Sequence, residues 1–137
     1  YASVYGHLKA AVEELASALE ARGQKVSVFD LARDDMAEAV EDAFRYDRLV
    51  LASITYQGEI FPCMSTFIHT LAEHAYQNRT VALVEAGSWA PAAAKVMTKE
   101  LEGMKDITLA QNKVTVLGSL NDASRAQIEV LADELSK

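Results

Sequence analysis

Residues 49–52 form a short apolar run, Leu-Val-Leu-Ala, that leads directly into a polar loop. A strand with one face in water alternates apolar and polar residues, so an unbroken apolar run is typical of a strand covered on both faces. Residues 81–84, Val-Ala-Leu-Val, have the same character. Strands of this kind, separated by helical sequence, need crossover connections. The sequence therefore predicts an α/β fold with a doubly wound, mostly parallel sheet.

The other segments alternate between helical and strand periodicity. Apolar residues spaced by three and four predict helices over residues 8–22, 31–46, 62–75, 92–104 and 122–135, the second of them helical from Met36. Residues 25–30 and 113–117 alternate, as edge strands do. Gly23 is expected to end the first helix and Pro62 to begin the third. Asn121 or Asp122 is expected to cap the last helix.

These segments supply four strands and leave one position in the sheet without a strand. A loop that leads into the first helix should follow a strand of about five residues, and no such residues precede Ser3. The absent strand would lie between residues 25–30 and 49–52, where an empty position leaves two rows of backbone groups unpaired. We therefore expect this chain to be a piece of a longer one, with either disorder or a substitute strand in this fragment.

Composition restricts the class of protein and its partners. The 137 residues are half hydrophobic and 24% charged, as in one ordinary globular domain. No apolar run approaches the ~20 residues of a membrane span, and no signal peptide opens the sequence, so we expect a cytoplasmic protein without a membrane partner. The net charge of −7 and the absence of a basic cluster argue against nucleic acid. The single cysteine, Cys63, excludes an internal disulfide and a cysteine-rich metal site.

Three loops are expected at the carboxyl edge of the sheet, where open α/β sheets bind their ligands. Residues 3–8 lead into a helix N-terminus, which favours an anion through its free N–H groups and dipole. Thr55, Tyr56 and Gln57 can hydrogen-bond and cover a flat heteroaromatic ring. Trp89, the only tryptophan, offers a stacking surface behind residues 87–88. Any α/β domain also needs small-residue turns before its helices, so each loop alone is weak evidence.

Together the loops resemble a known family. The motifs are Ser-Val-Tyr-Gly at 3–6, Thr-Tyr-Gln-Gly at 55–58 with Ile-Phe-Pro at 60–62, and the block at 76–91. They are similar to the flavodoxin-like domain of flavodiiron proteins (A-type flavoproteins), and the resemblance covers essentially the whole chain. It implies a three-layer flavodoxin-like fold with strand order 2-1-3-4-5, the first strand being largely missing here.

The resemblance also implies noncovalently bound FMN. The first loop would hold the phosphate, and the other two would surround the isoalloxazine. The implied FMN-binding residues are Ser3, Val4, Tyr5, Gly6, His7, Leu8, Ser53, Ile54, Thr55, Tyr56, Gln57, Gly58, Ala86, Gly87, Ser88 and Trp89.

One position departs from the family pattern. The phosphate loop of the family usually ends in Asn or Ser followed by Thr, and His7 and Leu8 stand in these places. A leucine side chain cannot donate to a phosphate. We therefore expect Leu8→Thr to tighten FMN and not riboflavin, which lacks the phosphate.

The function expected from the resemblance is electron transfer through FMN. The electron acceptor would be a diiron oxygen or nitric oxide reductase domain, absent from this sequence, or another redox partner. No residue receives a catalytic acid–base role, no metal ligand is expected, and homo-oligomerisation stays open. Two alternatives stay open as well: an apo interaction domain that has lost FMN, and a stand-alone NAD(P)H:quinone reductase. A receiver-type signalling domain is disfavoured, because Ser53 stands where it needs an aspartate.

Three further features have plain explanations. His69 and His74 lie five residues apart, which does not match the i, i+4 spacing of a metal pair. Cys63 at a helix start has no partner cysteine, so a packing role is favoured over a redox role. The acidic run at residues 34–42 is more typical of a solvated helix face than of a docking site for a basic partner.

Overall fold

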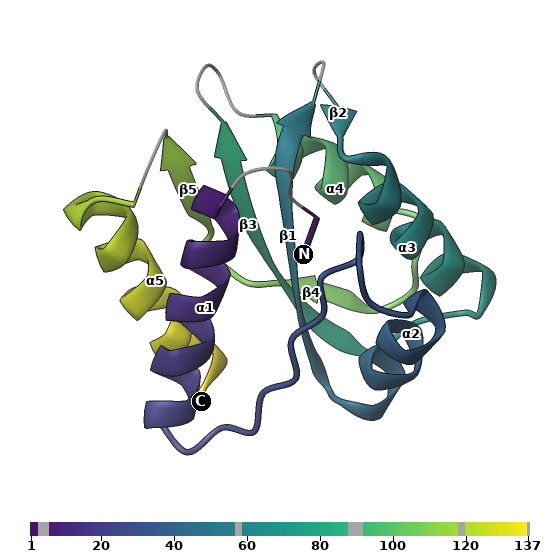
Figure 1. Ribbon diagram of the computed structural model, residues 1–137. Helices are drawn as coiled ribbons and strands as arrows, with labels where there is room; N and C mark the ends of the chain where they lie inside the picture. The colour runs from purple at the N-terminus through teal and green to yellow at the C-terminus, as the bar shows by residue number, and fades with distance from the viewer. Residues whose placement is uncertain (3–5, 57–58, 88–91, 118–119, 137) are drawn as a thin grey trace.

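The computed structural model describes residues 1–2, 6–56, 59–87, 92–117 and 120–136 (Figure 1). Helices and strands alternate along most of the chain. In chain order the described elements are α1 (Gly6–Ala21), α2 (Met36–Arg45), β1 (Arg48–Tyr56), β2 (Glu59–Ile60), α3 (Pro62–Glu73), β3 (Arg79–Gly87), α4 (Ala93–Leu101), β4 (Ile107–Leu109), β5 (Val114–Leu117) and α5 (Asp122–Leu135).

The sheet is built around β1 and β3, the two apolar runs. They pair in parallel from Arg48 opposite Thr80 to Ile54 opposite Ala86. The far side of β3 pairs in parallel with β4 at its beginning and with β5 at its end. The predicted parallel α/β architecture is confirmed. β2 is a two-residue strand antiparallel to β1, and neither β2 nor β4 was predicted, because such short segments have too few residues to show a period.

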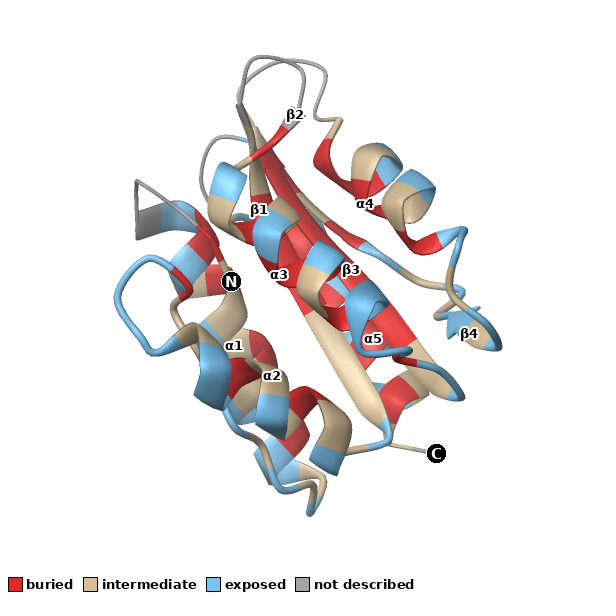
Figure 2. Cartoon of the chain, turned by 90° about the vertical axis from the view of Figure 1, so that its right-hand side faces the viewer, coloured by how far each residue is buried: buried red, intermediate tan, exposed pale blue. Residues whose placement is uncertain are grey.

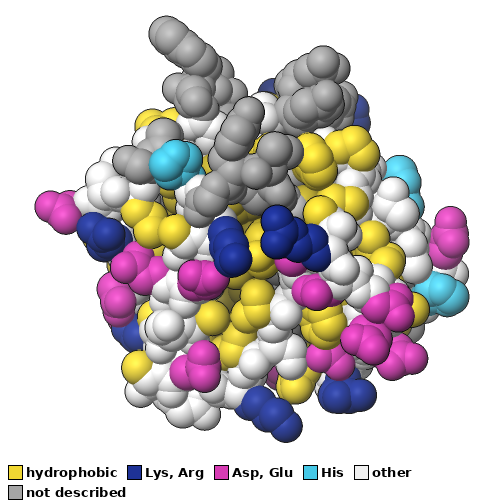
Figure 3. Space-filling model, in the orientation of Figure 1, with side chains coloured by type: hydrophobic (Ala, Val, Ile, Leu, Met, Phe, Trp, Pro, Cys, Tyr) yellow, Lys and Arg dark blue, Asp and Glu magenta, His cyan; other side chains and the backbone are white. Residues whose placement is uncertain are grey.

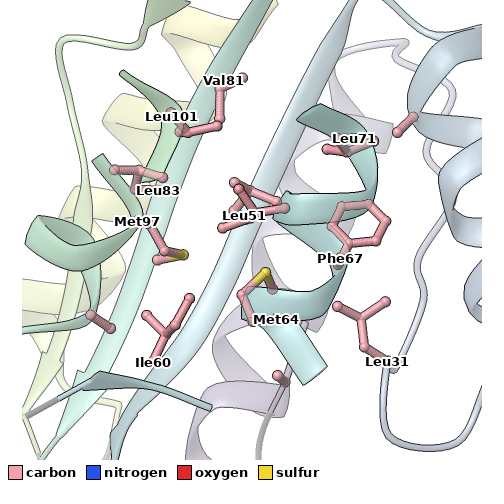
Figure 4. Close-up of a cluster of buried hydrophobic side chains, with 14 of the residues drawn as sticks. Leu31, Leu51, Ile60, Met64, Phe67, Leu71, Val81, Leu83, Met97 and Leu101 are labelled. Atoms are coloured by element: carbon pink, nitrogen blue, oxygen red, sulfur yellow. The ribbon is translucent and has the colours of Figure 1, made fainter. Parts of the chain in front are cut away.

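Helices cover both faces of the sheet, and alternate residues of β1 pack toward opposite faces. Ala52 belongs to the core under α1 and α5, together with Leu15, Val84 and Leu131. Leu51 belongs to the core under α2, α3 and α4, and Figure 4 shows it facing Met64 and Phe67 of α3. Burial is continuous along the middle of β1 and β3 (Figure 2). This explains why both strands lack the polar alternation of a half-exposed strand.

The predicted strand at residues 25–30 is wrong. The segment is extended, but it forms no ladder and belongs to no strand. Its backbone meets a neighbour at one end, where the Tyr1 ammonium donates to the Phe29 carbonyl (2.7 Å) and the Leu31 N–H donates to the Tyr1 carbonyl (2.9 Å). Ala2, the residue after Tyr1, forms an isolated parallel bridge with Ser53 of β1. The expected strand order 2-1-3-4-5, with its first strand largely missing, is therefore not confirmed, because a strand requires a paired neighbour along its length and residues 25–30 have none among the described residues.

The predicted helices form, and the predicted end signals act as expected. Pro62 is the first residue of α3, and Gly23 follows α1 with φ of +82°, a left-handed conformation that glycine adopts without strain. Asn121, one of the two expected caps, accepts a hydrogen bond from the Ser124 N–H in a capping box at the start of α5. None of the described helices combines the length and the apolar character that a membrane span requires.

Candidate functional site

The carboxyl ends of β1 and β3 and the N-terminus of α1 lie at one end of the molecule (Figure 1). Hydrogen bonds tie the entry to α1 to this edge: the Ala2 N–H donates to the Ala52 carbonyl, and the Ile54 N–H donates to the Ala2 carbonyl. The chain then reaches Gly6, the first residue of α1. Ala2, the residue before the first predicted loop, is thus bonded to the strand that leads into the second predicted loop.

Thr55 links the end of β1 to the start of α4. Its Oγ1 accepts hydrogen bonds from the N–H groups of Ala92 (2.9 Å) and Ala93 (3.3 Å) at the beginning of α4. The side chain therefore caps α4, a role that the sequence did not reveal. Its hydroxyl hydrogen has no acceptor among these contacts and can still be donated to a ligand.

Ser53 shapes the base of the second loop. The residue is buried, its hydroxyl donates to the Ile54 carbonyl (3.0 Å), and its Oγ accepts from the Phe61 N–H (3.2 Å). These bonds join the two ends of the β1–β2 hairpin. Since the hydroxyl hydrogen is used by the protein, we expect Ser53 to hold the loop in shape rather than to donate to a ligand.

Glu85 is a further residue of this edge that the sequence analysis missed. It is buried at the end of β3, and its carboxylate accepts from the Ala94 N–H (3.1 Å) and the Thr115 hydroxyl (2.9 Å). The Lys113 ammonium lies 3.4 Å from the same carboxylate. Glu85 thus fixes α4 to β3 just before the third loop. Its sequence signal was an acidic residue directly after the apolar run at 81–84, because a buried charge needs partners.

At the start of α1, His7 is exposed and Leu8 is buried. Leu8 packs in the core under α1 and α5, so its side chain turns away from the predicted phosphate. Its backbone N–H still belongs to the first turn of the helix, where it has no intrahelical partner. The first turn carries no acidic residue, so no local charge opposes an anion.

The remaining predicted residues divide into two groups. Ile54 and Ala86 pack against the core under α1 and α5, and Gly87 ends β3 half-buried. The other group lies outside the described residues: Ser3, Val4, Tyr5, Gln57, Gly58, Ser88, Trp89 and the side chain of Tyr56. Their contribution to a site stays a prediction.

No cluster of three or more potential metal ligands occurs in the described ranges. Cys63 is half-buried, and burial raises the pKa of its thiol, which disfavours the reactive thiolate. This environment supports the packing role expected for Cys63.

Residues 1–123 match the sequence model of the flavodoxin domain. The chain belongs to this family. The flavodoxin domain also resembles solved structures along its whole length. It aligns with rubredoxin oxygen:oxidoreductase from Desulfovibrio gigas with a TM-score of 0.92 and 17% identity, over 99% of this chain and 34% of that chain. It aligns with a flavodoxin from the domain Archaea with a TM-score of 0.85 and 17% identity, over 98% and 91%.

A third similar structure is the flavodiiron protein from Giardia intestinalis, with a TM-score of 0.88 and 14% identity over 98% of this chain and 34% of that chain. The TM-scores establish a shared fold with these proteins. The flavodoxin domain spans about a third of the two longer proteins and most of the archaeal flavodoxin. Among curated protein sequences, none matches significantly.

Proposed function

We propose that this flavodoxin domain binds FMN noncovalently and transfers electrons through it. The observation that carries the proposal is the arrangement of the ends of β1 and β3 and the start of α1 at one end of the sheet, in a chain whose family is named for flavodoxin. When bound, FMN would accept and donate one or two electrons, and the protein would bind it, orient it and exclude water from it.

The described residues suit the two ends of this ligand. The first turn of α1 would hold the phosphate through the backbone N–H groups of Gly6, His7 and Leu8, together with residues 3–5. The Thr55 hydroxyl, whose oxygen accepts from Ala92 and Ala93, would donate its hydrogen to the ring from the edge of β1. Thr55 and Glu85 together fix the start of α4, which would keep the third loop close to the second.

The proposed electron acceptor is a diiron domain in the same protein. Two of the similar structures are longer proteins, named rubredoxin oxygen:oxidoreductase and flavodiiron protein, and this chain aligns with about a third of each. A separate redox protein is the alternative acceptor.

Titration of FMN into the protein tests the proposal. We expect flavin fluorescence to be quenched as the ring leaves water and stacks on the protein. Riboflavin should bind more weakly, because it lacks the phosphate that the start of α1 would hold. No quenching at high micromolar protein would contradict the proposal and favour a domain that interacts with partners without FMN. Turnover of a quinone by NADH would instead identify a quinone reductase.

A charge placed at the start of α1 tests the phosphate site specifically. His7 is exposed at the second position of α1, so His7→Glu should leave the fold intact and even favour the helix dipole. The new carboxylate should weaken FMN by about tenfold or more through repulsion of the phosphate, and it should leave riboflavin unchanged. Ala37→Glu is the matched control, because Ala37 is exposed at the second position of α2. Equal weakening by both substitutions would exclude the start of α1 as the phosphate site.

A further inference from the structure

The edge of the sheet on the side of α5 is formed by β4 and β5. Both strands pair in parallel with β3, and no described strand pairs with their other side. Figure 1 shows β5 at this edge, beside α5. An edge strand presents N–H and C=O groups on which another chain can pair, so the partners of these groups decide whether the edge is open.

A side chain of α5 occupies the middle of the edge of β5. The Thr115 N–H donates to Oε1 of Gln127 (2.8 Å), and Gln127 is exposed on α5. The backbone groups of Thr115 therefore face away from β3. Because alternate residues of a strand face opposite neighbours, the Val116 N–H faces β3 and the Leu117 N–H faces outward.

A second side chain of α5 occupies the connection between β4 and β5. The Glu134 carboxylate accepts from the Gln111 N–H (2.8 Å), from the Asn112 N–H (3.0 Å) and from Nδ2 of Asn112 (2.7 Å). Gln127 and Glu134 are seven residues apart, which places them on one face of α5, about 10 Å apart along its axis. About three residues of extended chain cover the same length, so the spacing of the two side chains matches the spacing of the groups that they bind.

The sequence of β5 favours pairing with another strand. Its four residues, Val-Thr-Val-Leu, have high β propensity and carry no charge. Lys113 is a charge of the kind that protects edges, but its ammonium lies 3.4 Å from the buried Glu85 carboxylate. Leu117 is 56% exposed, and Val130 of α5 is 49% exposed in a hollow that Gln127 also lines. Apolar side chains thus flank the edge, and the hydrogen bonds from α5 oppose the addition of a strand.

We propose that α5 closes this edge against a second copy of the chain through Gln127, with Glu134 holding the connection beside it, and that two copies pair through β5 when the Gln127 acceptor is lost. A second copy fits because an edge is complementary to itself when two strands run antiparallel around a two-fold axis. With Thr115 at the axis, each Thr115 N–H would donate to the Thr115 carbonyl of the other copy, and Leu117 would lie opposite Lys113. The proposal does not depend on flavin binding.

Two substitutions at residue 127 test the proposal. Gln127→Ala removes the acceptor at an exposed position, keeps a strong helix former and adds no large apolar side chain. Gln127→Glu is the matched control, because a carboxylate oxygen with the same reach can still accept from the Thr115 N–H. Sedimentation over a range of protein concentrations measures association, and hydrogen exchange measures which amides are covered.

We expect Gln127→Ala to form a dimer at concentrations at which the association state of the original chain and of Gln127→Glu does not change. In dilute Gln127→Ala, the Thr115 amide should exchange faster than in the original chain by about tenfold or more, and its exchange should slow again as the dimer forms. The Leu117 amide should gain protection in the dimer. The Val116 amide faces β3 and serves as the internal reference.

Equal association of all three folded chains would overturn the proposal, because contacts elsewhere would then be responsible. Figure 3 shows hydrophobic side chains in the middle of the face that looks toward the viewer, and contacts there are independent of residue 127. A dimer of Gln127→Ala in which the Leu117 amide exchanges as fast as in the monomer would also overturn the proposal. A folded Gln127→Ala that stays monomeric at millimolar concentration would do the same.

Discussion

Tyr76 has the largest side chain among the described residues that are fully buried, yet its hydroxyl has no partner among them. The ring meets Phe44 edge to face, with centroids 5.1 Å apart, and the Arg79 guanidinium lies 5.3 Å from its centroid. Burial raises the pKa of Tyr76 to about 12. The ring therefore stabilises the folded state, whereas the hydroxyl destabilises it, because a buried polar group without a partner loses its hydrogen bonds to water.

We predict that Tyr76→Phe raises the free energy of unfolding by about 1 kcal/mol, because it removes this hydroxyl and keeps the ring. The effect on pH dependence has a definite sign. The native pKa lies above the ordinary value of 10.0, so unfolding releases a proton and stability falls as the pH rises from 10 to about 12. Measured by denaturant unfolding, the free energy of unfolding of Tyr76→Phe should therefore fall less between pH 10 and pH 12 than that of the unchanged protein. A variant less stable than the original at pH 7 would show that the hydroxyl has a partner.

Leu8 is a position where the structure changes a prediction made from sequence. Its side chain is 1% exposed and faces the core, so Leu8→Thr should lower the free energy of unfolding by about 2–4 kcal/mol. The hydroxyl would not face the phosphate, so tighter FMN binding is no longer expected. Val130→Thr, at a 49% exposed position of α5, is the control and should cost little. Tighter binding of FMN but not of riboflavin by Leu8→Thr would show that residue 8 turns toward the ligand.

At the scale of elements, α4 is held by side chains from two strands. Thr55 of β1 accepts from Ala92 and Ala93, and Glu85 of β3 accepts from Ala94. The first N–H groups of a helix have no intrahelical partner, and here they are satisfied by the strands that precede two predicted ligand loops. A change at either strand end is therefore transmitted to the start of α4.

We predict that Thr55→Val lowers the free energy of unfolding by about 0.5–2 kcal/mol, the usual cost of a lost helix cap. Valine has nearly the shape of threonine and lacks the acceptor oxygen. Hydrogen exchange at the Ala93 amide should accelerate more than exchange in the core of β3. Thr55→Ser keeps the oxygen and is the control, so equal acceleration in both variants would show that the acceptor oxygen is not what protects the start of α4.

At the scale of the whole molecule, the backbone pairing on the two sides of β1 differs in extent. β1 and β3 pair along seven residues, whereas the backbone hydrogen bonds that connect residues 29–31 to β1 among the described residues pass through Tyr1 and Ala2. The charge at the amino terminus lies within this weak connection. Its protonation should therefore affect the stability of the whole fold.

We predict that stability rises with pH up to about 8 in the original chain. The native pKa of the Tyr1 ammonium is lowered from 8.0, so unfolding binds a proton at pH values between the native pKa and 8.0. Nα-acetylation should remove this dependence and raise the melting temperature at pH 6, because the acetyl group removes the charge and its carbonyl can accept from the Ala52 N–H. The measurement is thermal unfolding of both forms at pH 6 and pH 9. A gain at pH 9 as large as at pH 6 would show that the charge is not responsible.

The sequence by itself determined the helices, the two central strands and the family. A helix forms its hydrogen bonds within one segment, so periodicity and end signals such as Pro62 and Asn121 are local information. The apolar runs at 49–52 and 81–84 identified β1 and β3, because a strand that is buried on both faces has apolar residues at consecutive positions. The loop motifs indicated the flavodoxin domain, and the family match over residues 1–123 agrees with them.

The tertiary structure alone decided the rest. Residues 25–30 have the alternation of a strand but remain unpaired along most of their length, because a strand exists through its neighbour and the neighbouring position holds two residues. The inward turn of Leu8, the capping of α4 by Thr55 and the burial of Glu85 depend on contacts between distant segments. Such contacts leave no period in the sequence, since each is made once, between residues that the chain brings together only when it folds.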